Sequence, residues 1–293
     1  MLRTLLFAPA NVTRRVDKAL GLNADAIILD LEDSVPITEK YLARSLVVEA
    51  LRKPRKGLVY VRVNALTTRL TIDDISAVVC PELDGIILTK VEEPVDLQKT
   101  DWLIEHLENK HSIPTGSLDL IPLVENAKGV HNAYHIARAV PRVKRLCFGA
   151  IDYGADLGVK LTEEGSELFY ARSHLVNASR AAGLEPPIDT VYPDIKNPDG
   201  FIEDIRTAVN LGFQGKLVLH PDQIAVANVS FSPSQEEIEY AKKVIAAFEK
   251  AEAQGHAAIT MDNGKFIDYP VVHGARRLLE LANKISQKDE KQA

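Results

Sequence analysis

Short apolar runs rich in β-branched residues recur along the chain, and each is bounded by Gly, Pro or polar residues. The eight runs cover residues 4–9, 26–33, 58–64, 84–90, 118–125, 144–152, 188–193 and 215–221. Their nearly continuous apolar character is typical of parallel strands that are buried on both faces. Helical patterns lie between the runs, for example over residues 38–53 and 163–183. The second of these ends at Gly183 shortly before two prolines, which is a typical helix stop.

The eight units follow one another at intervals of about 25 to 30 residues, a spacing that suits β–α repeats. We therefore predict an α/β protein with a (β/α)8 barrel of the TIM type. The alternative is a doubly wound open sheet, which would carry a glycine-rich phosphate-binding turn after its first strand. The segment that follows the first run, APANVTRR, contains no glycine, and this favours the barrel.

The pattern changes near residue 232. A helix begins at Ser234 with two glutamates in its first turn, where the helix dipole favours acidic side chains. A turn-rich segment follows, and then a last helix over residues 271–285. The sequence thus predicts two parts, a catalytic barrel over residues 1–232 and a C-terminal helical extension over residues 233–293.

Composition limits the classes of function. The 293 residues carry a formal net charge of −6 with both signs spread along the chain, so no basic stripe is available to hold nucleic-acid phosphates. Two cysteines, Cys80 and Cys147, exclude a disulfide framework and a cysteine-rich zinc site and favour a reducing compartment. The N-terminal apolar run is broken by Pro9 and Asn11, and no run reaches the roughly 18 apolar residues of a membrane span. We therefore expect a cytoplasmic protein without nucleic-acid or membrane partners.

Polar side chains follow nearly every apolar run, at the end of the barrel where active sites of this fold lie. They are Asp30, Glu32, Asp33, Arg62, Asn64, Lys90, Glu125, Asn126, Asp152, Tyr192, Asp194 and His220. Glu125 and Asp152 end neighbouring runs, so their carboxylates could approach each other and would then need a cation or a shared proton. Oxygen ligands without His or Cys favour a hard cation such as Mg²⁺. Alternatively, both carboxylates cap loops or pair with nearby cations.

Two cations at the same end of the barrel each have two interpretations. The fork of Arg62 suits a planar carboxylate or carbonyl group of a substrate, but the residue could equally form a structural ion pair with Asp30 or Glu32. Lys90 could form a Schiff base, as in barrel aldolases. The alternative role of Lys90 is that of a simple ion-pair partner.

A basic segment follows the first run, where Arg14, Arg15 and Lys18 lie close together. These side chains could meet phosphates of a ligand, or they could form the solvated face of a helix. The chain has no P-loop, and the glycines within residues 149–158 form no known phosphate-binding fingerprint. Any phosphate recognition would therefore depend on such cations.

Eleven strings follow one another in an order that resembles one family. They are LLFAPANVTRR, ADAIILDLEDSV, VRVNAL, DGIILTKVE, IPLVENAKGV, FGAIDYGADLG, ASRAAGL, DTVYPDIKNPDGF, GFQGKLVLHPDQI, FSPSQEEIE and NGKFIDYPVV. The chain resembles the citrate lyase β-subunit-like proteins of the HpcH/HpaI aldolase superfamily, the group that also contains malyl-CoA and citramalyl-CoA lyases. The likeness extends over about residues 2–284. The string LHP is more similar to the stand-alone CoA lyases than to the true β-subunit of the citrate lyase complex.

The resemblance implies a (β/α)8 barrel with a C-terminal extension, commonly assembled as a homotrimer. It implies a Mg²⁺-dependent enzyme that cleaves or forms the carbon–carbon bond between an acyl-CoA enolate and a keto acid. The metal ligands of the family fall on Glu125 and Asp152. The arginine that binds the substrate falls on Arg62.

The resemblance also assigns roles outside the metal centre. The cations that approach the CoA phosphates fall on Arg14 and Lys18. The carboxylate that acts as acid–base falls on Asp268, in an extension that serves as a lid over the active site of a neighbouring subunit. The residue pattern offers an alternative, because Asp268 precedes Tyr269 and Pro270 and could simply cap the last helix.

The predicted reaction is the cleavage of a 3-hydroxy-dicarboxylic or tricarboxylic acyl-CoA, such as citramalyl-CoA or malyl-CoA, to acetyl-CoA and a 2-keto acid. One alternative is the citryl-thioester lyase β-subunit of a citrate lyase complex. Another is a metal-dependent aldolase that acts on free hydroxy-keto acids. A thioesterase or malate-synthase-type activity and a non-catalytic scaffold are further alternatives.

Overall fold

The computed structural model describes residues 1–261 and 264–292. The chain divides into two compact units, Leu2–Asn228 and Val229–Ala293, and the latter includes Met1. None of the described helices is both long and apolar enough to cross a membrane.

The first unit is a closed barrel of eight parallel strands in the order of the sequence. The strands are β1 (Thr4–Pro9), β2 (Ala26–Asp30), β3 (Leu58–Val63), β4 (Gly85–Leu88), β5 (Asp119–Val124), β6 (Cys147–Phe148), β7 (Ile188–Asp189) and β8 (Gly215–Val218). Leu5 of β1 pairs with Ala26 on one side and with Leu217 on the other, which closes the barrel. The predicted TIM-type barrel is confirmed, and the open sheet is excluded.

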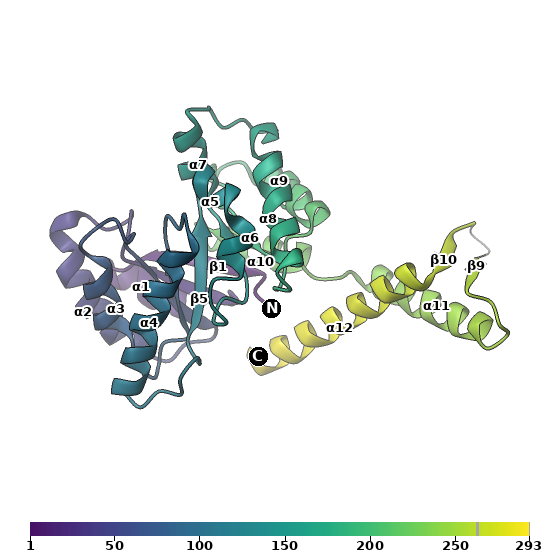
Figure 1. Cartoon of the computed structure of the whole chain (residues 1–293), viewed down its shortest axis with the longest axis horizontal. Coiled ribbons are helices and arrows are strands. Elements are labelled where there is room, and N and C mark those ends of the chain that lie inside the picture. The colour runs from purple at the N-terminus through teal and green to yellow at the C-terminus, as the bar shows by residue number, and fades with distance from the viewer. Residues whose placement is uncertain (262–263, 293) are drawn as a thin grey trace. The chain divides into compact units, whose positions relative to one another are not determined.

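Helices cover the outside of the barrel, as Figure 1 shows for α1 to α4. The α-helices of this unit are α1 (Thr13–Leu20), α2 (Lys40–Leu51), α3 (Thr71–Val78), α4 (Pro94–Lys110), α5 (Ala127–His131), α6 (Ala133–Ala137), α7 (Ala150–Leu157), α8 (Phe169–Ala181), α9 (Pro198–Leu211) and α10 (Asp222–Ser230). Single 3₁₀ turns precede α2 and α8, at Ile37–Glu39 and Ser166–Leu168. The division between the two units falls within α10.

The interior of the barrel is filled by side chains from every strand. They are Leu5, Ala26, Ile28, Tyr60, Ile87, Ile121, Leu123, Cys147, Ile188 and Leu217, together with Leu2 just before β1. Cys147 is fully buried, so the structure gives it a packing role. Because this plug is apolar, the charged residues that follow the strands gather above it, at the carboxyl ends.

The apolar run over residues 144–152 is much longer than the strand that it contains. The sequence predicts a strand over residues 144–152, whereas β6 covers only Cys147–Phe148 and α7 begins at Ala150. The amide of Ala150 donates to Thr190 Oγ1 at 2.8 Å, and the helix ends at Gly158 with a φ of +68°. Asp152 therefore lies in the first turn of a helix and not at the end of a strand.

The second unit is built around two long helices and a small antiparallel sheet, as Figure 1 shows. Helix α11 (Gln235–Glu252) begins with a capping box, in which Ser234 Oγ accepts from the amide of Glu237 at 3.2 Å. Strands β9 (Ala258–Thr260) and β10 (Phe266–Asp268) pair, and Val244, Phe248, Ile267 and Val272 form the core.

The last helix is longer than the sequence predicts. Helix α12 spans Tyr269–Gln292, whereas the predicted helix ends at residue 285. Lys, Gln and Glu dominate the added turns and are good helix formers, and Ser286 Oγ bonds Glu290 Oε1 at 3.1 Å. Asp262 and Asn263, which the sequence assigns to a turn, lie outside the described residues.

Candidate active site

A cavity of about 450 Å³ opens at the carboxyl ends of the strands. Its walls combine apolar side chains from the barrel plug with five charged groups, four of them at or near strand ends and one in the first turn of α7. The charged groups are Asp30, Asp33, Arg62, Glu125 and Asp152, and Arg15 from α1 completes the lining. The prediction that these strand-end residues converge is thus confirmed for five of them.

Arg62 is held rigidly at the wall of the cavity. Its Nε and Nη2 donate to the two oxygens of Asp30 at 2.6 and 2.7 Å, and the guanidinium lies 4.7 Å from the centre of the Phe7 ring. Burial alone would raise the pKa of Asp30, but the hydrogen bonds and charge of Arg62 hold it below its usual range. Arg62 therefore has the ion pair that one interpretation predicts, and it faces the cavity as well.

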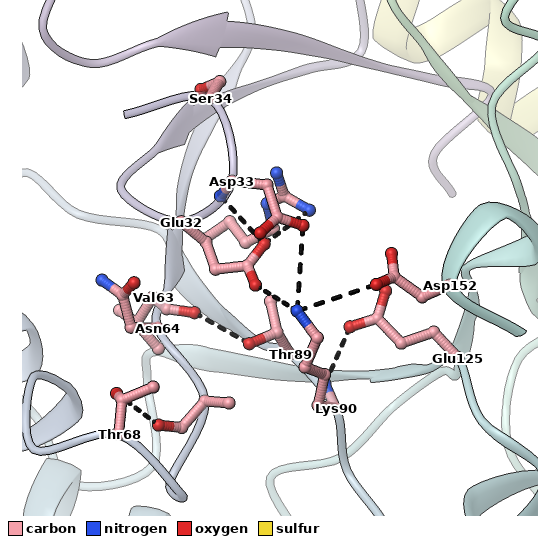
Figure 2. Close-up of polar contacts among 12 residues, drawn as sticks. Glu32, Asp33, Ser34, Val63, Asn64, Thr68, Thr89, Lys90, Glu125 and Asp152 are labelled. Atoms are coloured by element: carbon pink, nitrogen blue, oxygen red, sulfur yellow. Dashed lines mark hydrogen bonds and ion pairs between the residues drawn. The ribbon is translucent and has the colours of Figure 1, made fainter. Parts of the chain in front are cut away.

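Glu32 links Arg62 to Lys90. Glu32 Oε2 lies 3.2 Å from Arg62 Nη1, and Glu32 Oε1 accepts from Lys90 Nζ at 2.5 Å. Figure 2 shows the Lys90 ammonium between the carboxylates of Glu32 and Asp152. Burial lowers the pKa of Lys90, but the bond with Glu32 and the surrounding carboxylates raise it above its ordinary value overall. A permanently protonated amine is no nucleophile, so this setting opposes a Schiff base.

Glu125 is almost completely buried in the wall of the cavity. Only 2% of its surface is exposed, and its Oε1 accepts from the backbone N–H of Lys90 at 2.9 Å. Burial, and then the charge of Asp152, raises the pKa of Glu125 to about 8. Asp152 thus lies near enough for its charge to oppose the ionisation of Glu125, which agrees with the predicted approach of the two carboxylates.

Gly149 allows Glu125 to take this position. A Cβ atom at residue 149 would lie 2.6 Å from both Cβ and Oε2 of Glu125, a distance that real side chains do not tolerate. Glycine at the start of α7 thus lets the carboxylate of Glu125 lie directly against the backbone that leads to Asp152. Sequence reasoning assigned no role to this glycine, because close packing between chain segments leaves no local signal.

The donor set fits a hard divalent cation. Glu125 and Asp152 supply only oxygen ligands, and no group of three or more His, Cys, Asp or Glu among the described residues could hold a metal. Mg²⁺ commonly uses one or two carboxylates and takes its other ligands from water and substrate. Burial and the charge of Asp152 raise the pKa of Glu125, and a cation bound to both carboxylates would favour their ionised forms.

Other predicted strand-end residues do not join the cavity. Asn64 turns away, since its Nδ2 donates to Asp74 at 2.6 Å and its Oδ1 accepts from Lys40 Nζ at 2.9 Å. Asn126 caps α5 by accepting from the amide of Gly129 at 2.7 Å. Tyr192 and Asp194 line a separate cavity of about 200 Å³.

The basic residues of α1 divide between two environments. Arg14, Arg15 and Lys18 are all exposed; Arg14 and Lys18 lie one turn apart on the helix, and Arg15 also lines the main cavity. The sequence prediction chose Arg14 and Lys18 for the phosphates of CoA, and this assignment stays a prediction. The residue pattern offers Arg15 as a phosphate contact together with these two, and Arg15 is the member of the segment that lines the cavity.

Asp268 ends β10 in the second unit. Its Oδ1 accepts from the amide of Val271 at 3.2 Å, so it caps the start of α12. The capping interaction that the sequence offers as an alternative is therefore present. Its catalytic role stays a prediction.

The barrel and its cavity match one protein family. The HpcH/HpaI aldolase/citrate lyase family matches residues 3–221, which is most of the chain, and the protein belongs to this family. It is therefore a lyase of the citrate lyase β and citramalyl-CoA lyase type.

Two relatives of known type match this chain over nearly its full length. The citrate lyase subunit beta of Leuconostoc mesenteroides is 38% identical over 96% of this chain and 93% of its own. Human mitochondrial citramalyl-CoA lyase is 32% identical over 98% of this chain and 87% of its own. The structure of the CitE protein from Mycobacterium tuberculosis in complex with magnesium, acetoacetate and coenzyme A is 29% identical, covers 96% of this chain and 98% of that one, and has a TM-score of 0.77.

Proposed function

We propose that the protein cleaves a 3-hydroxyacyl-CoA with a terminal carboxylate, such as citramalyl-CoA or malyl-CoA, to acetyl-CoA and a 2-keto acid with the help of Mg²⁺. The observation that carries this proposal is the meeting of Glu125, Asp152 and Arg62 in one cavity. The magnesium, acetoacetate and coenzyme A in the CitE structure support the same class of substrate and metal.

Glu125 and Asp152 would hold the metal. When bound, Mg²⁺ supplies Lewis-acid polarisation of the hydroxyl and carboxylate oxygens of the substrate. Glu125 is fixed for this task by the backbone of Lys90 and by its contact with Gly149.

Arg62 would stabilise the negative charge that develops on the thioester oxygen. In cleavage the substrate hydroxyl gives up its proton and becomes the keto oxygen of the 2-keto acid, the bond between the carbinol carbon and the α-carbon of the thioester breaks, and its electron pair moves into the enolate of acetyl-CoA. The proton that leaves the hydroxyl balances the one that the enolate carbon takes up. Asp30 and Glu32 hold the guanidinium before the reaction begins, so little reorganisation is needed as the charge appears. A proton must then reach the enolate carbon, and Asp268 of the lid is our candidate donor.

A panel of acyl-CoA esters tests this function. A short acyl-CoA and a keto acid should appear by mass spectrometry for one of the esters when Mg²⁺ is present: acetyl-CoA from citramalyl-, malyl- or citryl-CoA, and propionyl-CoA from methylmalyl-CoA. Cleavage only of a citryl group on a carrier protein would instead identify a β-subunit of a citrate lyase complex, which the 38% identical relative favours. Cleavage of free hydroxy-keto acids without CoA would identify an aldolase.

The basic face of α1 gives a prediction about CoA. Because charge-assisted bonds from Arg and Lys hold phosphates, the double change of Arg14 and Lys18 to Ala should raise KM for the CoA ester much more than it lowers kcat. Steady-state kinetics measure this split. The single change Arg15→Ala provides a comparison from the cavity side, and an unchanged KM in the double variant would favour the free-acid aldolase.

Asp268 gives a prediction about proton transfer. Asp268→Asn should lower kcat by at least ~100-fold, because a positioned acid–base contributes about that much, while KM stays nearly unchanged. Asparagine can still accept from the amide of Val271, so the cap of α12 and the fold are kept. A kcat near that of the wild type would contradict the catalytic role.

Mixed oligomers test whether the lid acts on a neighbouring subunit. Asp268→Asn protomers keep the metal ligands, and Glu125→Ala protomers keep the lid carboxylate. If Asp268 serves the site of another subunit, mixing the two inactive proteins should restore part of the activity. No recovery in oligomers verified to be mixed would reject the arrangement between subunits.

A further inference from the structure

Lys90 has a backbone conformation that residues with a side chain rarely adopt. Its φ is +52°, in the left-handed region that favours glycine. This conformation directs its N–H to Glu125 Oε1 at 2.9 Å. Glycine would supply the same N–H with less strain, so the side chain of Lys90 has a role that glycine could not fill.

The Lys90 side chain lies among the acidic groups of the site. Its ammonium is 2.5 Å from Glu32 Oε1, 3.7 Å from Asp152 Oδ1 and 3.8 Å from Asp33 Oδ2 (Figure 2). Within residues 1–261 and 264–292, Lys90 is the one ion-pair partner of Asp152. Lys90 thus contacts Glu125 through its main chain and Asp152 through its side chain.

We propose that Lys90 is a positioning residue that replaces part of the metal's positive charge in the metal-free enzyme and lowers the affinity of the site for a divalent cation. This inference rests on the proposed function, in which Glu125 and Asp152 hold Mg²⁺. The ammonium keeps Asp152 turned toward Glu125 until a metal arrives. Because two cations a few ångströms apart repel each other even in water, the same ammonium opposes metal binding.

The consequence is a dependence of metal binding on the substrate. A site with two carboxylate ligands and a neighbouring ammonium holds Mg²⁺ weakly, since this ion needs further oxygen ligands to complete its shell. A substrate that brings a hydroxyl and a carboxylate supplies these ligands. Mg²⁺ therefore binds tightly only together with the substrate.

The test uses the full-length protein and Mn²⁺ as a spectroscopic probe, without any substrate. Lys90→Met keeps the aliphatic stem and removes the charge, so the Kd for Mn²⁺ measured by electron paramagnetic resonance should fall at least ~10-fold. Lys90→Arg keeps the charge and should stay within about threefold of the wild type. In EDTA, Lys90→Met should also have a lower Tm, because Glu32 loses one of its two ion-pair partners and keeps only Arg62.

A second lysine provides the matched control. Lys53 has a side chain that is 38% exposed, against 36% for Lys90, and it pairs with Asp17 at 2.6 Å away from the cavity. Lys53→Met should leave the Kd for Mn²⁺ unchanged.

The possible outcomes separate the two proposals. An unchanged or weaker Kd for Mn²⁺ in Lys90→Met overturns the role of Lys90, even if the Tm falls as it would for any structural lysine. Absence of Mn²⁺ binding in both the wild type and Lys90→Met overturns the metal site of the proposed function and the role of Lys90 with it. Tighter Mn²⁺ binding in Lys90→Met supports the role of Lys90. If the wild type is at the same time inactive toward every acyl-CoA, only the proposed substrate is contradicted.

Discussion

Replacing Glu125 by Gln is expected to lower kcat by at least ~1000-fold at high Mg²⁺ concentration. The amide oxygen can still accept from the backbone of Lys90, but one of the two anionic metal ligands is lost. Metal polarisation of a substrate oxygen contributes several kcal/mol, and about 4 kcal/mol corresponds to ~1000-fold in rate. Asp152→Asn should have the same effect, and release of acetyl-CoA measured against Mg²⁺ concentration checks both.

The stability of the Glu125→Gln variant separates loss of metal from loss of fold. Burial, and the charge of Asp152, raise the pKa of Glu125 to about 8, so the metal-free protein disfavours the ionised carboxylate. A neutral amide removes this penalty, and the Tm in EDTA should not fall below that of the wild type. Glu203→Gln, at an exposed position on α9, is the control that should keep full activity. Full activity of Glu125→Gln, or of the wild type in EDTA, would show that the metal-dependent mechanism is wrong.

The strands could be predicted because their buried positions leave a continuous apolar signal. The carboxyl-terminal ends of the runs were less clear, because the chain stays apolar or small after the last paired residue. In the segment 144–152, the residues Gly149 and Ala150 continue the apolar run although the ladder ends at Phe148. Whether a strand continues or a helix begins there depends on the contact of Ala150 with Thr190, 40 residues away.

The charged residues of the site could be predicted as a group, but only some of their partners could. A barrel brings all strand ends to one face, which makes convergence of Arg62, Glu125 and Asp152 an expectation of topology alone. Sequence reasoning offered Glu32 only as one of two structural partners for Arg62. Its additional contact with Lys90 depends on the direction of each side chain and is visible only in the structure.

In the second unit the local contacts could be predicted from the sequence, whereas the function could not. Local signals predicted the start of α11, because a capping box involves residues three positions apart. They also predicted the cap of α12 by Asp268. A catalytic role for the same carboxylate depends on assembly, which no local pattern encodes, and it therefore rests on the resemblance and on the mixing experiment.

Arg62→Lys is expected to lower kcat by ~100- to 1000-fold while the metal site remains intact. Removal of one preorganised donor to a developing oxyanion has an effect of this size. Lysine keeps the charge, but it cannot reproduce the two parallel bonds that fix the guanidinium on Asp30 at 2.6 and 2.7 Å. The change should therefore appear in kcat for the acyl-CoA, and the Kd for Mn²⁺ should stay within a few fold.

A second buried arginine distinguishes loss of this function from loss of stability. Arg142 pairs with Asp101 and Glu108 at 2.6 Å each, away from the residues that line the cavity. Arg142→Lys breaks a comparable buried pair, so it should lower the Tm with little effect on kcat. If Arg62→Lys behaves in the same way, with a lower Tm and a kcat near that of the wild type, Arg62 is a structural ion-pair partner and the charge of the enolate must be stabilised by another group.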